Sequence, residues 1–287
     1  MRDKRMAELE QLRAEYHATE PPEGGLGQVR RRMEEARRAA RSPSAPARWG
    51  IGVAAALALF VAVPNVSPTA AAALSQVPGL GAVVRVVTLN RYQFDDGTHA
   101  ADVKTPALAG DSAAAKQVNG DAAAYTKQLL ERFCSDVERS GGSYAALNVD
   151  YAVVTDTADW FTLRIDAEET AASGYAYARY YNIDKATGQV VTLADLFRED
   201  ADYVTAISEN IKAQMRARMA ADPEADYFID SEEDPELDFR AIQPDQAFYR
   251  DADGALHIAF DEYEVAPGSM GRQEFAVDNA AIEDILK

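Results

Sequence analysis

The stretch Gly174-Tyr-Ala-Tyr-Ala-Arg-Tyr-Tyr-Asn-Ile-Asp184 alternates bulky side chains with small ones along most of its length. Tyr175, Tyr177, Arg179 and Tyr181 therefore fall on one side of an extended chain, because successive side chains of a strand point to opposite faces. Alternation of this kind is typical of antiparallel sheets, whereas strands of parallel sheets are usually apolar on both faces. The stretch predicts a strand of an antiparallel sheet.

Elements of both kinds surround this strand. Apolar residues at helical spacing, among them Tyr125, Leu129, Leu130, Phe133 and Val137, predict a helix that two glycines end. The predicted helices are residues 121–140 and 200–221, and the predicted strands are residues 80–94, 146–155, 160–168, 174–184, 189–193, 247–250 and 255–263. An Asp- and Gly-rich turn joins the last two strands as a hairpin. We therefore expect an α+β domain, an antiparallel sheet with packed helices.

Charge is distributed very unevenly along the chain. The net charge is -18 over 287 residues, yet residues 1–48 hold 11 Lys/Arg and 8 Asp/Glu, whereas the remaining residues hold 18 and 39. These two parts carry +3 and -21, which suggests that they work in different places. A domain at -21 repels nucleic acid and attracts cationic partners, so we expect no nucleic-acid partner.

An uncharged stretch of 36 residues lies between Arg48 and Arg85. Its most apolar part, residues 49–66, would be about 27 Å long as a helix, close to the roughly 30 Å of a bilayer core. Residues 30–48 contain seven arginines and only two glutamates. This excess of positive charge predicts that the N-terminal side lies in the cytoplasm. This pattern predicts a single-pass protein of the cell membrane with an extracytoplasmic C-terminal domain. A signal-peptide region and a buried core helix are the alternatives.

The cytoplasmic residues 1–48 predict two short helices and a linker. In the first, Met6, Leu9, Leu12 and Tyr16 fall on one face at spacings of three and four. Two such helices bury little apolar surface by themselves, so this face is expected to contact a protein partner. The alternative is a helical stub next to the membrane.

Small residues follow the predicted span in Ser67-Pro-Thr-Ala-Ala-Ala-Ala73. Pro68 is expected to end the helix, and Ala70, Ala72 and Ala73 supply the small side chains that signal peptidase accepts. Residues 67–82 are therefore expected to form a juxtamembrane segment with a candidate cleavage site, ahead of an exported domain at residues 83–287.

Patterns that carry catalytic or metal chemistry are missing from the sequence. Cys134 is the sole cysteine, and the three histidines, His17, His99 and His257, lie in separate segments. No phosphate-binding loop, dinucleotide fingerprint or nucleophile elbow is present. We therefore expect that the chain is not an enzyme and that it binds no metal or cofactor. A hydrolase that uses two of the many carboxylates is an open alternative, because sequence spacing does not reveal spatial pairs.

Two longer stretches carry a family resemblance. Tyr180-Tyr-Asn-Ile-Asp-Lys-Ala-Thr-Gly-Gln-Val-Val-Thr-Leu-Ala-Asp-Leu-Phe197 resembles the N-I-D-x-x-T-G-x-x-x-x-L-x-D-L-F stretch of the exported domain of RsiV-like anti-sigma factors. Glu262-Tyr-Glu-Val-Ala-Pro-Gly-Ser-Met-Gly-Arg-Gln-Glu-Phe275 is similar to the Y-E-x-A-P-G-x-x-G-x-x-x-F stretch of the same domain. The loop residues that match the second stretch are Tyr263, Pro267, Gly268 and Gly271.

The resemblance implies a regulator of transcription. In this family the cytoplasmic head holds an extracytoplasmic-function sigma factor inactive, and the outer domain binds lysozyme in the type member. Signal peptidase and then an intramembrane protease cut the chain and release the sigma factor. The implied partners are that sigma factor, both proteases, and lysozyme or another cationic protein. A membrane-anchored module that binds cell-wall glycan or protein without signalling is the alternative function.

Overall fold

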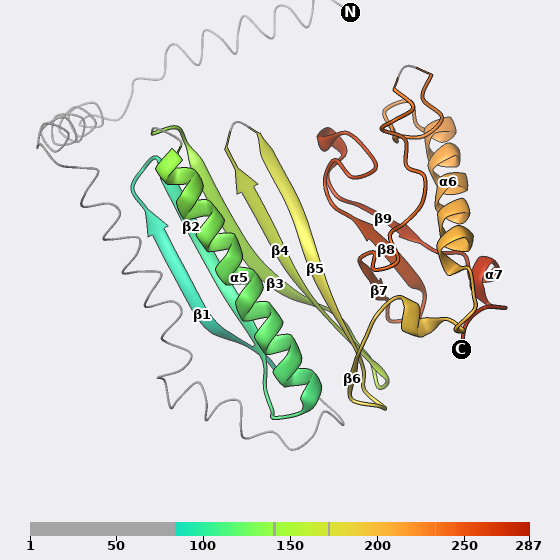
Figure 1. Cartoon of the computed structure of the whole chain (residues 1–287), viewed down its shortest axis with the longest axis horizontal. Coiled ribbons are helices and arrows are strands. Elements are labelled where there is room, and N and C mark those ends of the chain that lie inside the picture. Colours follow the sequence, from blue (N-terminus) through green and yellow to red (C-terminus); the bar gives the residue numbers. More distant parts are fainter. Residues whose placement is uncertain (1–83, 140–141, 172, 233) are drawn as a thin grey trace, which may run out of the picture. The chain divides into compact units, whose positions relative to one another are not determined.

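The computed structural model describes residues 84–287 apart from residues 140–141, 172 and 233. These residues form an α+β fold with two sheets (Figure 1). In chain order the elements are β1 (Val86–Asp95), β2 (His99–Leu108), α5 (Ala113–Arg139), β3 (Ala145–Asp156), β4 (Trp160–Thr170), β5 (Gly174–Asp184), β6 (Gln189–Val191), η1 (Ala194–Leu196), α6 (Tyr203–Ala221), β7 (Phe248–Arg250), β8 (Leu256–Phe260), η2 (Gly268–Met270), β9 (Gln273–Ala276) and α7 (Asn279–Ile282).

The six-stranded sheet follows chain order from β1 to β6. All of its neighbouring strands are antiparallel except β2 and β3, which are parallel. A parallel pair needs a crossover connection, and α5 is that connection. The expectation of an antiparallel sheet is therefore confirmed from β3 to β6 and wrong at β2 and β3, so the sheet is mixed.

Helix α5 packs on one face of this sheet (Figure 1). Leu129, Leu130 and Phe133 are buried on the helix face that the sequence predicts. The Arg179 guanidinium of β5 lies over the Tyr125 ring of α5, 4.4 Å from its centroid. The odd-numbered side chains of β5 thus point toward α5, as the alternation of this strand requires.

The second sheet has three antiparallel strands in the order β7-β8-β9. Arg250 pairs with Leu256 across the predicted hairpin, which is therefore confirmed. The buried side chains of β8, β9 and α6 form an apolar core in which the Phe260 and Phe275 rings meet edge to face at 5.8 Å. The Asn182 side chain of β5 donates to the Phe248 carbonyl at 2.8 Å and so ties the two sheets together.

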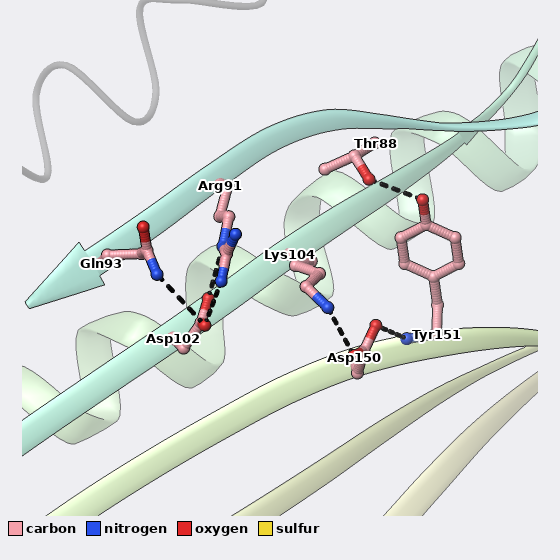
Figure 2. A network of polar contacts seen from close by, with 7 residues as sticks. All are labelled: Thr88, Arg91, Gln93, Asp102, Lys104, Asp150 and Tyr151. Carbon is pink, nitrogen blue, oxygen red and sulfur yellow. Dashed lines mark hydrogen bonds and ion pairs between the residues drawn. The ribbon is translucent and has the colours of Figure 1, made fainter.

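Strand β1 is at the edge of the six-stranded sheet and carries exposed polar contacts (Figure 2). Arg91 donates from two nitrogens to the Asp102 carboxylate of β2 at 2.9 and 2.5 Å, and Gln93 donates to the same group at 3.3 Å. Lys104 of β2 pairs with Asp150 of β3 at 2.5 Å. Exposed pairs of this kind contribute about 0–1 kcal/mol each. The bonds to Asp102 join β1 to β2, and the Lys104–Asp150 pair joins β2 to β3.

Candidate functional site

The loop after β8 has an unusual backbone that its sequence explains. Tyr263 has a φ of 66°, which residues with a side chain rarely adopt. Its ring covers Gly268, where an added Cβ atom would lie 2.2 Å from the ring. Gly271 has a φ of 63° and ends η2, which begins after Pro267. The structure thus brings together the four predicted loop residues, and close packing explains the glycine after Pro267.

Glu264 organises the start of this loop. One of its carboxylate oxygens accepts the Asp261 N–H at 2.8 Å, and the other accepts the Gln246 side-chain amide at 2.9 Å. The buried Gln246 amide also donates to the Ala259 carbonyl at 3.0 Å. These bonds fix the carboxylates of the loop relative to β8.

Two further carboxylates of the loop reach the outer edge of β5. Asp261 accepts the Ala178 N–H at 2.9 Å, and Glu262 accepts the Ala176 N–H at 2.7 Å. The Glu262 N–H in turn donates to the Ala176 carbonyl at 3.0 Å. Edge strands of soluble proteins need protection of this kind against pairing with other chains. The loop therefore both covers β5 and holds its own acids in fixed positions.

Burial raises the pKa of Asp261 to about 6, and the neighbouring Glu264 carboxylate acts in the same direction. The Ala178 N–H and the Arg272 guanidinium oppose that rise because they favour the ionised form. Asp261 is thus a carboxyl group that changes its charge in mildly acidic conditions.

The loop borders a surface groove of about 400 Å³. Tyr175 of β5 and Tyr263 are 42% and 49% exposed, and their rings stack with centroids 6.2 Å apart. The groove is lined by Tyr175, Gln243, Asp245, Gln246, Ala247, Ala259, Asp261, Glu262, Tyr263 and Glu264, which include four carboxylic acids and no Lys or Arg. We call it the acidic tyrosine groove. Its chemistry suits a cationic group, which carboxylates and aromatic faces both attract.

The sequence pattern identifies Tyr263 of the loop but not the other residues that complete the groove. Tyr175 was assigned only to a strand, and Asp245 and Gln243 come from the segment before β7, outside both quoted stretches. No local pattern marks them, because their proximity to Tyr263 depends on the packing of the second sheet against β5.

The stretch Tyr180–Phe197, one of the two that carry the family resemblance, includes the turn between β5 and β6. Asp184 accepts the N–H groups of Ala186 and Thr187 at 2.7 and 3.0 Å. The buried Lys185 ammonium reaches back to Asp156, the last residue of β3, and to the carbonyl of Thr157, which follows it. The stretch therefore joins two turns at one end of the sheet, a role that its sequence does not reveal.

The remaining predicted sites lie outside the described residues. These are the head face of Met6, Leu9, Leu12 and Tyr16, the apolar span at residues 49–66, and the candidate cleavage residues Ala70, Ala72 and Ala73. Within residues 84–287, no helix is long and apolar enough to cross a membrane. Among these described residues, no three His, Cys, Asp or Glu side chains form a group that could hold a metal ion.

Comparison with known proteins identifies the family. The family described as "Protein of unknown function (DUF3298)" matches residues 194–279, which contain the loop between β8 and β9. Anti-sigma-V factor RsiV of Bacillus subtilis is 36% identical over 280 residues, which cover 97% of this chain and 96% of RsiV. The chain belongs to the RsiV-like anti-sigma factors. The resemblance of the two quoted stretches is confirmed.

Other relatives of this RsiV-like anti-sigma factor share parts of it. The peptidoglycan-N-acetylmuramic acid deacetylase PdaC of Bacillus subtilis is 28% identical over 145 residues, 49% of this chain and 29% of PdaC. Crystal structures of DUF3298 family proteins from Bacteroides fragilis and Pseudomonas aeruginosa each align with a TM-score of 0.50 at 15% identity. They cover 72% and 73% of this chain and 95% and 97% of their own, which shows a shared fold.

Proposed function

We propose that this chain is a membrane-anchored anti-sigma factor that sequesters an extracytoplasmic-function sigma factor until an outside ligand triggers its proteolysis. Membership of the RsiV-like family supports the role, and the match along nearly the whole of RsiV supports a similar arrangement of head and outer domain. The opposite charges of the two parts support their location on opposite sides of a membrane.

In this proposal the head binds the sigma factor through the apolar face of its first helix, formed by Met6, Leu9, Leu12 and Tyr16. The span at residues 49–66 anchors the head in the cell membrane with its N-terminus in the cytoplasm. Signal peptidase cuts near Ala70–Ala73, and an intramembrane protease then releases the head with the sigma factor.

The acidic tyrosine groove is the proposed receptor for a cationic protein, and lysozyme is the candidate ligand. The observation that carries this assignment is the combination of four carboxylic acids, no Lys or Arg, and two stacked exposed tyrosines along one groove. Tyrosine and arginine contacts dominate the energetics of many protein interfaces. A groove of this kind fits a protruding Arg or Lys side chain of the ligand.

The groove is tested by reversing one charge at its rim. Asp245 is exposed, so Asp245→Lys should leave the melting temperature nearly unchanged. It should weaken lysozyme binding by the full-length protein on the order of 10-fold, because like charges then face each other. The matched control is Asp253→Lys, at the exposed tip of the hairpin, which changes the net charge equally. Equal weakening by both variants would contradict a local receptor site.

A binding module without a signalling role is the second candidate, favoured by the partial match to PdaC. That module predicts that deletion of residues 1–48 has no effect on transcription. The proposed anti-sigma factor predicts constitutive activity of the sigma factor after the same deletion. We also propose that the chain is no enzyme; turnover of peptidoglycan fragments by the purified outer domain would contradict this.

A further inference from the structure

A larger cavity, of about 880 Å³, opens at the end of the six-stranded sheet where β6 lies beside β7 (Figure 1). We call it the β6 cleft. One row of residues across three strands forms its floor, because Trp160 of β4 pairs with Asp184 of β5, which pairs with Gln189 of β6. The hairpin of β7 and β8 forms one wall. The cleft shares no lining residue with the acidic tyrosine groove, so it is a separate site.

The Arg250 guanidinium on the hairpin wall is held in place without an ion pair in the described part of the chain. It lies over the Trp160 ring, 5.2 Å from the ring centroid, and its Nε atom donates to the Gly254 carbonyl at 3.2 Å. Its two terminal nitrogens are not among the buried polar atoms that lack a partner, so they are accessible to a ligand. Two accessible donors of one guanidinium match the two oxygens of a carboxylate.

The charges around Arg250 restrict the ligand further. The lining carries four aspartates and two cations, Asp159, Asp184, Asp195, Asp278, Arg250 and Lys287. All of the aspartates except Asp159 accept hydrogen bonds from neighbouring backbone or side-chain groups. These carboxylates repel a polyanion such as nucleic acid or an anionic membrane surface. The suited ligand therefore has one carboxylate on an otherwise uncharged body.

Strand β6 offers such a body both backbone groups and apolar surface. It is the last strand of the sheet, and among the described strands it pairs only with β5. Val190, Leu196 and Leu286 line the cleft and are only partly buried. An extended peptide can pair with the outer edge of a strand and place its side chains on the apolar surface beside it. The body that fits the cleft is therefore an extended peptide.

The distance between the β6 edge and Arg250 sets the length of this peptide. Neighbouring strands lie about 4.8 Å apart, so Gln189 lies about 10 Å from Trp160, over which the Arg250 guanidinium is placed. An extended chain advances about 3.3–3.6 Å per residue. Three or four residues thus reach from the edge of β6 to the guanidinium.

We propose that the β6 cleft binds the C-terminal end of an extended, uncharged peptide, whose free carboxylate pairs with Arg250 and whose backbone adds to the outer edge of β6. The side chains of its last residues lie against Val190, Leu196 and Leu286. This site is independent of the proposed receptor for a cationic protein, because it takes a carboxylate and is built from other residues.

Titration calorimetry on the full-length protein in detergent micelles tests the carboxylate contact. The probe is the peptide acetyl-Val-Thr-Val-Ala with a free carboxylate, and its matched control is the same peptide with a C-terminal amide. The acid should bind on the order of 10-fold more tightly than the amide, because only the acid forms charge-assisted bonds with Arg250. Equal affinities, or no binding of the acid at about 1 mM, would overturn the proposal.

Arg250→Gln tests the position of the contact. This variant should bind the acid as weakly as the wild type binds the amide. Arg240→Gln is the matched control, because Arg240 is exposed, lines neither cavity and carries the same charge. Wild-type affinity of the Arg250 variant, or an equal loss in the Arg240 variant, would contradict the assignment. Thermal melts verify that both variants fold, and the acid and amide comparison on the unmodified protein decides if the Arg250 variant does not.

Pairing with β6 is tested by two N-methylated forms of the acid, one methylated at its first and third residues and one at its second and fourth. Only alternate N–H groups of a strand point to its neighbour. One form should therefore bind on the order of 10-fold more weakly than the other, since its methyl groups replace the paired hydrogens. Equal affinity of the two forms would rule out pairing with the strand. Binding of inorganic phosphate as tight as that of the acid would show a site for any anion and overturn the peptide as ligand.

Discussion

Gly268 illustrates how single residues set the shape of the acidic tyrosine groove. The clash of an added Cβ involves the far end of the Tyr263 side chain, not backbone. The ring can therefore swing away from Gly268 at small cost, but it then leaves its stack with Tyr175. A substitution at Gly268 can therefore alter the groove while the loop stays folded.

Gly268→Ala should consequently lower lysozyme affinity several-fold and change the melting temperature little. Gly120→Ala is the matched control, because no atom lies within 4 Å of that added Cβ and the site is within α5. It should raise stability by roughly 0.5–1 kcal/mol and leave affinity unchanged. Calorimetric titration and thermal melts measure both. An affinity loss in the Gly120 variant, or a large stability loss in the Gly268 variant, would count against the packing argument.

Asp261 predicts a pH dependence of stability with a defined sign. Its folded pKa of about 6 lies above the ordinary 3.8, so between about pH 4 and 6 the folded state binds more protons than the unfolded state. This carboxyl group therefore makes the protein less stable as pH rises through that window. The rise corresponds to up to about 3 kcal/mol, which solvent screening lowers to about 1–2 kcal/mol at this partly exposed group.

Asp261→Asn keeps an oxygen for the Ala178 N–H and removes the charge. It should exceed the wild type in stability by about 1–2 kcal/mol at pH 7.5 and match it near pH 3.5, as measured by urea unfolding. The exposed Asp234→Asn variant should follow the wild type at both pH values. A stability gain of equal size at both pH values would mean that the charge of Asp261 is not its cause.

At the scale of elements, the turn after β5 depends on one buried cation. The Lys185 side chain is 3% exposed and pairs with Asp156, which is 38% exposed, whereas the Lys212 pair with Glu209 on α6 joins side chains that are 20% and 61% exposed. Removing the buried Lys185 ammonium takes a donor from the part-buried Thr157 carbonyl and from the Asp156 carboxylate.

Lys185→Met should therefore destabilise the protein by about 1–3 kcal/mol, because Asp156 and the Thr157 carbonyl both lose a donor. Lys212→Met should change stability by at most about 0.5 kcal/mol, as is usual for exposed helix pairs. Chemical unfolding of the two variants provides the comparison. Similar small losses in both would show that water replaces Lys185 without cost.

The elements also show where sequence patterns succeed. The bounds of β5 were predicted in full, because alternation and flanking turns are local signals. The sequence does not predict strand β2, because it contains three Ala, one Asp, one Lys and Pro106, all weak strand formers. The start of α5 was placed too late because Asn119 and Gly120 resemble a helix stop. In the fold Asn119 binds the Leu108 N–H and carbonyl at 2.7 and 3.0 Å, a tertiary contact that overrides the local signal.

At the scale of the whole molecule, we propose that a head, a span and an acidic outer domain form one switch. The sequence predicts this division because charge and hydropathy change abruptly along the chain, and for residues 1–83, which lie outside the described residues, it stays a prediction. It could predict the loop of the candidate site through Tyr263 and its glycines, but not the groove. Tyr175, Asp245 and Glu262 meet there only because the second sheet packs against β5.

The most direct measurement is the amount of sigma factor that co-purifies with the full-length chain from membranes, before and after lysozyme is added. We expect an extracytoplasmic-function sigma factor in a ratio near one to one before addition and its loss in step with release of the outer domain. Leu9→Asp with Leu12→Asp should remove the sigma factor from the start, because burying one leucine contributes roughly 1.5–3 kcal/mol. Absence of any such sigma factor, or its retention in full after the outer domain is shed, would contradict the account.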